Sequence, residues 1–113
     1  MKLLIYALLS LVLVQPVHAA DQDTRQFELR KANQKLNDLY QEMLRRLPEV
    51  EQPKLKKAQR AWISLRDLDC KWAFGAEPLD CMIDRTENRV RELEQTVFFD
   101  SAGAYQRVKD KSK

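Results

Sequence analysis

Apolar residues recur at spacings of three and four along three segments of this chain, and proline-containing breaks separate the segments. This period places the apolar side chains of each segment on one face of an α-helix. Beyond residue 20, glycine is scarce, β-branched runs are absent, and Ala, Leu, Lys, Arg, Glu and Gln dominate, which favours helix. The pattern predicts an all-α fold, a small antiparallel three-helix bundle.

The predicted helices cover about 24–47, 53–73 and 80–98. Pro48 ends the first, Pro53 suits the first turn of the second, and Asp80 is a plausible N-cap of the third. Residues 74–78 read as a turn, and residues 101–113 as a polar tail with a short helical turn near 105–108. The predicted inward-facing stripes are Ala32, Leu36, Leu39, Met43 and Leu47; Leu55, Ala58, Trp62, Leu65 and Leu68 or Asp69; and Ile83, Thr86, Val90, Leu93 and Val97.

The first 19 residues have the three-part layout of a secretory signal peptide, with a basic start, an apolar middle and small residues at its end. We predict cleavage after Ala19, with Ala20 as the next candidate. A membrane anchor is the alternative, but the apolar run has only about 12 residues, against about 20 for a membrane span. The sequence therefore predicts a domain over 20–100, export to an oxidising compartment such as a bacterial periplasm, and no membrane span in the mature form.

The two cysteines, Cys70 and Cys81, form an even pair, which in an exported protein indicates a disulfide. It would clamp the turn between the second and third helices. Zinc is the alternative, but a zinc site takes about four ligands, and the only histidine, His18, lies in the predicted signal segment. We expect no metal and no other cofactor.

Loss of Lys2 with the signal segment lowers the formal net charge from +3 to +2, with both signs mixed along the chain. This balance does not indicate a nucleic-acid partner. The sequence has no phosphate-binding glycine loop and no metal motif, and without histidine the mature chain has no Ser–His or Cys–His pair. We therefore expect a protein that is not an enzyme.

Polar residues share a face of the second predicted helix with Trp62 and Cys70. The face comprises Gln59, Trp62, Arg66 and Cys70, with Asp67 beside it and Thr86 and Arg89 on the third helix. One interpretation is a recognition surface in which Arg66 or Arg89 reaches a partner carboxylate. The interpretation that we favour is a polar network that fixes helix register, because partly buried charges are usually paired.

Trp72, Lys71 and Arg85 lie near the predicted disulfide and are further candidates for partner binding. Exposed aromatic residues can anchor a partner. Trp burial tendencies instead place Trp72 at the edge of the core, and this is the position that we expect.

Three elements of the sequence resemble one family. Leu36-Asn37 followed by Tyr40 resembles an LN-x-x-Y element, and residues 58–70 resemble the signature AQ-x-x-W-x-x-x-RD-x-x-C. The ending C-x4-T-x2-R-x3-L is matched by Cys81, Thr86, Arg89 and Leu93. Together they resemble the LprI-type lysozyme-inhibitor-like family of bacterial envelope proteins, over about 33–94. Many relatives carry a further Cys before the LN element, and this chain has none there.

The resemblance implies a small helical envelope domain and a candidate activity, the inhibition of lysozyme. The family-motif positions that it assigns are Gln59, Trp62, Arg66, Asp67, Cys70, Cys81, Thr86 and Arg89. We expect an inhibitor that binds lysozyme or a related peptidoglycan hydrolase. The alternatives are a structural or adaptor module of the periplasm, and an immunity protein against a cell-wall-degrading toxin.

Overall fold

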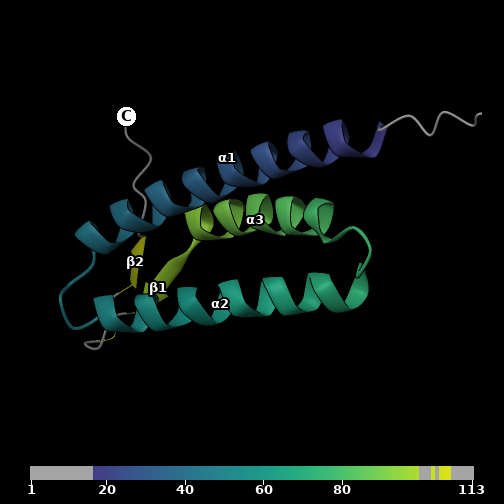
Figure 1. Ribbon diagram of the computed structural model, residues 1–113. Coiled ribbons are helices and arrows are strands. Elements are labelled where there is room, and N and C mark those ends of the chain that lie inside the picture. Colours follow the sequence, from purple (N-terminus) through teal and green to yellow (C-terminus); the bar gives the residue numbers. More distant parts are fainter. Residues whose placement is uncertain (1–16, 100–102, 104, 108–113) are drawn as a thin grey trace, which may run out of the picture.

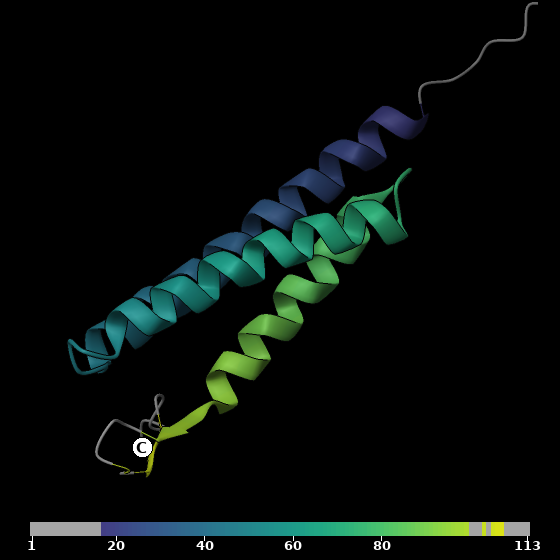
Figure 2. The ribbon, with the colours of Figure 1, turned by 90° about the horizontal axis from the view of Figure 1, so that it is seen from below.

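The computed structural model describes residues 17–99, 103 and 105–107. Within these residues the elements are α1 (Val17–Arg46), α2 (Gln52–Ala73), α3 (Pro78–Gln95), β1 (Val97–Phe99) and β2 (Tyr105–Arg107). Figure 1 shows consecutive helices running in opposite directions, with α3 drawn between α1 and α2. Figure 2 shows that α3 is inclined to the other two helices. The predicted all-α antiparallel bundle is confirmed.

The helix ends follow the prolines. α2 has Pro53 in its first turn, and α3 begins at Pro78, where the fixed φ angle of proline suits a first helical position. The prediction that Asp80 caps α3 is wrong, because Glu77 occupies the N-cap position without a side-chain hydrogen bond and Asp80 lies inside the first turn. The described part of α1 runs from Val17, ahead of the predicted start near residue 24, and residues 17–24 contain no proline or glycine that would break a helix.

The core is built mainly by α1 and α3. Leu36, Leu39 and Met43 of α1 pack with Val90 and Leu93 of α3 into one buried cluster. Leu47, Leu55 and Trp62 pack against this cluster from its edge. The predicted inward stripe of α1 is therefore confirmed, and in α3 the buried residues Thr86, Val90 and Leu93 belong to the predicted stripe as well.

The predicted inward stripe of α2 is wrong for most of its residues. Leu65 is 61% exposed and Leu68 is 69% exposed, and Ala58 is exposed too. The buried residues of α2 are Gln59, Arg66 and Cys70. The disulfide at Cys70 turns this polar face towards α3, and the aliphatic face consequently points outward. We call Ala58, Ala61, Leu65, Leu68 and Trp72, all exposed, the outer stripe.

The predicted helical turn near 105–108 is also wrong. Residues Tyr105–Arg107 form β2, which pairs antiparallel with β1, with Phe98 opposite Gln106. Val97 belongs to β1 rather than to α3, and Val108 lies outside the described residues. β-branched and aromatic residues such as Val97 and Tyr105 favour strands, which accounts for the difference.

An ion pair joins the start of α1 to the start of α3. Arg25 Nε lies 2.9 Å from Asp80 Oδ1, and Arg25 also donates a hydrogen bond to Glu28 over 2.9 Å. The hydrogen bond to Glu28, and then the charge of Asp80, raise the pKa of Arg25 above its ordinary value. Both partners are exposed enough that solvent screens the pair, so it orients the helices more than it stabilises them.

The predicted signal segment lies largely in residues 1–16, outside the described residues, so its cleavage stays a prediction. In the part of the chain that the structure describes, no helix combines the length and the apolar character needed to cross a membrane.

Candidate functional site

One guanidinium group connects all three helices. Arg66 Nη1 donates to Asn33 Oδ1 of α1 over 2.7 Å and to Thr86 Oγ1 of α3 over 2.9 Å. Its Nε and Nη2 contact Asp67 Oδ1 at 2.9 and 2.8 Å. Arg66 is buried, yet its charge is neutralised and its donors are occupied, which is the condition under which a buried cation is tolerated.

Thr86 is fully buried and serves as a relay between this arginine and the backbone. Its hydroxyl donates to the carbonyl oxygen of Met82 over 2.6 Å and accepts from Arg66. A threonine hydroxyl can do both at once because it carries one donor and two lone pairs. The residue fixes the axial position of α3 against α2, since a shift of either helix would separate the two groups.

Trp62 lies against two arginines. The guanidinium carbons of Arg66 and Arg89 are 5.5 and 5.6 Å from the centroid of its ring, within the range of cation–π attraction. Arg89 Nε also donates to Gln59 Oε1 over 3.4 Å. We call this set, Asn33, Gln59, Trp62, Arg66, Thr86 and Arg89, the polar seam. The seam is the polar network that we favoured from the sequence. Within it, Arg66 and Arg89 point inward.

Asn33 is the member of the seam that sequence reasoning missed. It lies three residues before Leu36 and four before Asn37, so its position on the inward side of α1 could have been recognised from the helical period. A lone amide beside an apolar stripe gives no sign of its partner, and only the assembled bundle brings Arg66 of α2 to it.

The second group of candidate residues surrounds the disulfide. Cys70 and Cys81 are joined, with 5.6 Å between their Cα atoms, as the sequence predicted. Trp72 is 82% exposed, so the expectation that it lies at the core edge is wrong. Lys71 is exposed beside it, and Arg85 forms an ion pair with Asp69. We call residues 74–77, together with Lys71 and Trp72, the disulfide turn.

The structure thus divides the predicted partner-binding residues between two places. Arg66 and Arg89 belong to the polar seam, whereas Lys71 and Trp72 are exposed at the disulfide turn. Arg85 is partly exposed on α3 and held by its ion pair with Asp69. The exposed residues are therefore available to a partner, and the seam residues hold the helices that carry them.

A groove of about 360 Å³ runs between α1 and α2 above the seam. Its lining contains Asn37 and Tyr40 of the LN-x-x-Y element, together with Arg60 and Ile63 of α2. Exposed amide and guanidinium groups at this groove can form hydrogen bonds with a polar ligand or a protein surface.

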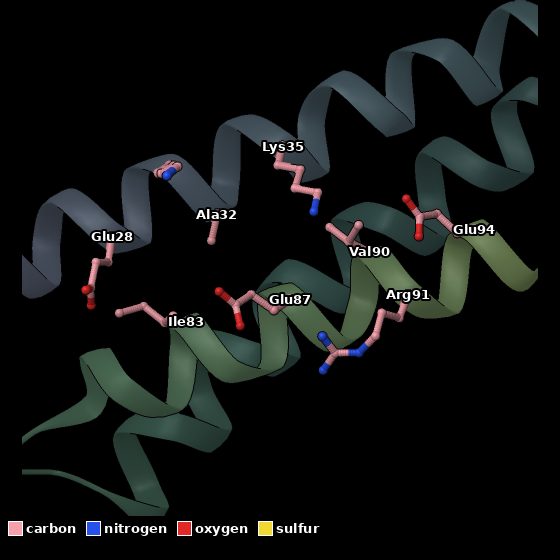
Figure 3. A pocket seen from close by; sticks show the side chains of 9 residues that line it. Glu28, Ala32, Lys35, Ile83, Glu87, Val90, Arg91 and Glu94 are labelled. Atoms are coloured by element: carbon pink, nitrogen blue, oxygen red, sulfur yellow. The ribbon is translucent and has the colours of Figure 1, made fainter.

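A larger groove, of about 620 Å³, lies between α1 and α3. Figure 3 shows its lining, with Ala32 and Val90 on facing helices and charged side chains of both signs around them. The labelled charged residues are Glu28, Lys35, Glu87, Arg91 and Glu94. Acids and bases alternate here, so the groove has no strong preference for a charged ligand.

The described residues show which nucleophiles and metal ligands this surface offers. Both cysteines are in the disulfide, so neither offers a thiolate nucleophile. Among the residues that the structure describes, no group of three or more His, Cys, Asp or Glu side chains is placed to hold a metal ion. The site is a surface carried by a rigid helical frame.

Comparison with known proteins gives one match. Residues 18–93 match the family described as Lysozyme inhibitor LprI, and this range covers all of α2, nearly all of α1 and α3, and both cysteines. No curated protein and no solved structure matches the chain. The match spans more than half of the sequence and includes the polar seam and the disulfide, and the chain therefore belongs to the LprI lysozyme-inhibitor family.

Proposed function

We propose that this protein is an exported, periplasmic inhibitor that binds lysozyme or a related peptidoglycan hydrolase. Family membership supports the activity, because the family is described as a lysozyme inhibitor. The disulfide supports export, since such bonds persist in oxidising compartments. An inhibitor needs no catalytic group of its own, which fits a chain whose two cysteines are both bonded.

The disulfide turn is the contact surface that we propose, and the exposure of Trp72 is the observation that carries this choice. Trp72 is 82% exposed, and tryptophan is among the residue types that most often anchor a protein partner. Lys71 places a cation beside it. Many glycoside hydrolases cleave their substrate between two carboxyl groups, so a cation carried on a protruding aromatic surface suits the mouth of such a cleft.

Rigidity is the second requirement of this mechanism. The bond between Cys70 and Cys81 holds the end of α2 against the start of α3, and the ion pair between Asp69 and Arg85 lies beside it. A surface that is already ordered loses little conformational entropy on binding. In this proposal Arg66 and Arg89 are positioning residues, which act by fixing α2 rather than by contacting the hydrolase.

The test is isothermal titration of a c-type lysozyme with the oxidised, exported protein and with two variants. Lys71→Ala/Trp72→Ala removes the proposed contact, and we expect at least a tenfold loss of affinity, equivalent to about 1.4 kcal/mol. Arg60→Ala is the matched control, because it removes an exposed cation of the same helix at the α1–α2 groove. We expect this control to bind as the parent does.

Two results would count against the proposal. Equal binding by the parent and the Lys71→Ala/Trp72→Ala variant would remove the disulfide turn from the interface. Loss of binding in Arg60→Ala would place the interface at the α1–α2 groove instead. A titration at two temperatures excludes a binding enthalpy that happens to be near zero. No binding of lysozyme at roughly 100 µM, weaker than ordinary specific complexes, would contradict lysozyme as the target.

A further inference from the structure

The outer stripe is an apolar face that is exposed in the part of the chain that the structure describes. Its residues Ala58, Ala61, Leu65, Leu68 and Trp72 follow one another at spacings of three, four, three and four, which is the heptad pattern of paired helices. At the step of about 100° per residue of an ideal helix, the stripe lies roughly opposite Cys70. The bundle instead uses the face of α2 that carries Gln59, Arg66 and Cys70, together with Leu55 and Trp62.

We propose that the outer stripe is a homodimer interface, in which α2 packs antiparallel against α2 of a second copy of this chain. An isolated exposed leucine needs no explanation, but Leu65, Leu68 and Trp72 together are 61%, 69% and 82% exposed on one face. A two-fold arrangement covers this face with the same face of another molecule, so no further complementary surface is required.

The sizes of the side chains favour the antiparallel arrangement. With Leu65 opposite Leu68 of the second copy, the same two-fold relation places Ala61 opposite Trp72. The four layers from Ala61 to Trp72 then contain either two leucines or one alanine and one tryptophan, and Ala58 lies beside the turn that follows α2 of the second copy. Parallel pairing would instead give two layers of two alanines and one layer of two tryptophans. Packed interfaces combine large with small side chains, and this is achieved only when the helices run in opposite directions.

The charges along α2 favour the same direction. Its first half carries Lys54, Lys56, Lys57 and Arg60, whereas the turn after its last residue carries Glu77. In the antiparallel pair, Lys56 and Lys57 lie beside Glu77 of the second copy. Parallel pairing would place the basic halves side by side, which is repulsive.

The length of the stripe sets the strength of the dimer. From Ala58 to Trp72 it extends about 21 Å at 1.5 Å per residue, or two heptads. A standard specific interface buries about 800 Å² on each partner, and a contact of two heptads lies at the low end of that range. We therefore expect a reversible dimer with a dissociation constant of roughly 10 to 100 µM.

The test is sedimentation equilibrium of the oxidised, exported protein from about 5 to 500 µM, without any hydrolase. We expect the average mass to rise towards twice that of the monomer. Leu65→Lys/Leu68→Lys should remain monomeric throughout. Phe27→Lys is the matched control, because Phe27 is 59% exposed but lies on α1, and it should associate as the parent does. A parent protein that remains monomeric at 500 µM would overturn the proposal.

The relative direction of the two α2 helices in the dimer is tested by zero-length amine-to-carboxylate crosslinking followed by mass spectrometry. Lys57 and Ala73, the last residue of α2, are about 24 Å apart at 1.5 Å per residue, and Glu77 lies in the turn beyond Ala73. A zero-length crosslink between Lys57 and Glu77 must therefore join two molecules. We expect this crosslink in the parent and its loss in Leu65→Lys/Leu68→Lys. A dimer that gives Lys57 crosslinks elsewhere but never to Glu77 would contradict the antiparallel arrangement.

Discussion

Arg66 of α2 donates a hydrogen bond to the hydroxyl of Thr86 in α3 over 2.9 Å, and both side chains are buried. The same nitrogen reaches Asn33 of α1, so a single charged group ties the three helices together. In a bundle whose aliphatic cluster lies mainly between α1 and α3, this contact is a principal attachment of α2.

Replacement of Arg66 should therefore destabilise the whole fold. We expect Arg66→Ala to lower the free energy of unfolding by about 2–4 kcal/mol, because it leaves Asn33 and Thr86 without their partner and opens space at the seam. Urea unfolding followed by circular dichroism measures this change.

The control for that prediction is Arg60→Ala, an exposed arginine of the same helix, which should change stability by less than about 0.5 kcal/mol. Thr86→Val tests the other end of the bond and should cost about 1–3 kcal/mol, whereas Thr86→Ser keeps the hydroxyl and should cost less. Equal stability of Arg66→Ala and the parent would show that the seam does not hold α2.

Replacement of a leucine by alanine should have very different effects on stability at Leu36 of α1 and at Leu65 of α2. Leu36 is 3% exposed in the core, and Leu36→Ala should cost about 2–5 kcal/mol. Leu65 is 61% exposed, and Leu65→Ala should cost less than about 0.5 kcal/mol when measured at low micromolar concentration, where the monomer prevails. Similar losses for both would mean that the aliphatic face of α2 is packed inside the monomer.

The disulfide should contribute to stability mainly by restricting the unfolded chain. Cys70 and Cys81 close a short loop, with a sequence separation of 11 residues, so reduction should lower the free energy of unfolding by about 2–3 kcal/mol. Urea unfolding with and without reductant measures the difference. Mass spectrometry after alkylation of the unreduced protein should find no free thiol, and two alkylated cysteines would contradict the pairing.

The variant Leu65→Lys/Leu68→Lys distinguishes the proposed dimer interface from the proposed hydrolase-binding surface. Trp72 belongs both to the outer stripe and to the disulfide turn, so a dimer covers part of the surface proposed for the hydrolase. We expect the monomeric variant to inhibit lysozyme as well as the parent does, and better at concentrations where the parent is dimeric. Loss of inhibition in this variant would indicate that the hydrolase occupies the stripe.

The sequence predicted the fold best at positions where a single local feature, such as a proline or a cysteine, determines the structure. Pro53 marks the start of α2 closely, as predicted, and the two cysteines of the sequence have one possible pairing. Pro78 begins α3, although the sequence placed it in the preceding turn. The inward stripe of α1 was predictable as well, because its apolar face has no competing face.

The orientation of α2 was not predictable in this way. This helix has two faces with helical spacing, one aliphatic and one containing Gln59, Arg66 and Cys70, and hydrophobicity alone selects the wrong one. The decisive facts are the covalent bond of Cys70 and the hydrogen-bond partners of Arg66 on two other helices, which no local pattern contains. Trp72 was misplaced for the same reason.

The most direct test of the proposed function is the rate at which a c-type lysozyme lyses bacterial cell walls, titrated with the oxidised protein. We predict that lysis falls in proportion to added protein and stops near one equivalent, and that Lys71→Ala/Trp72→Ala requires at least ten times more protein. An unchanged rate of lysis at a large excess of the parent protein would contradict the account of this chain as a lysozyme inhibitor.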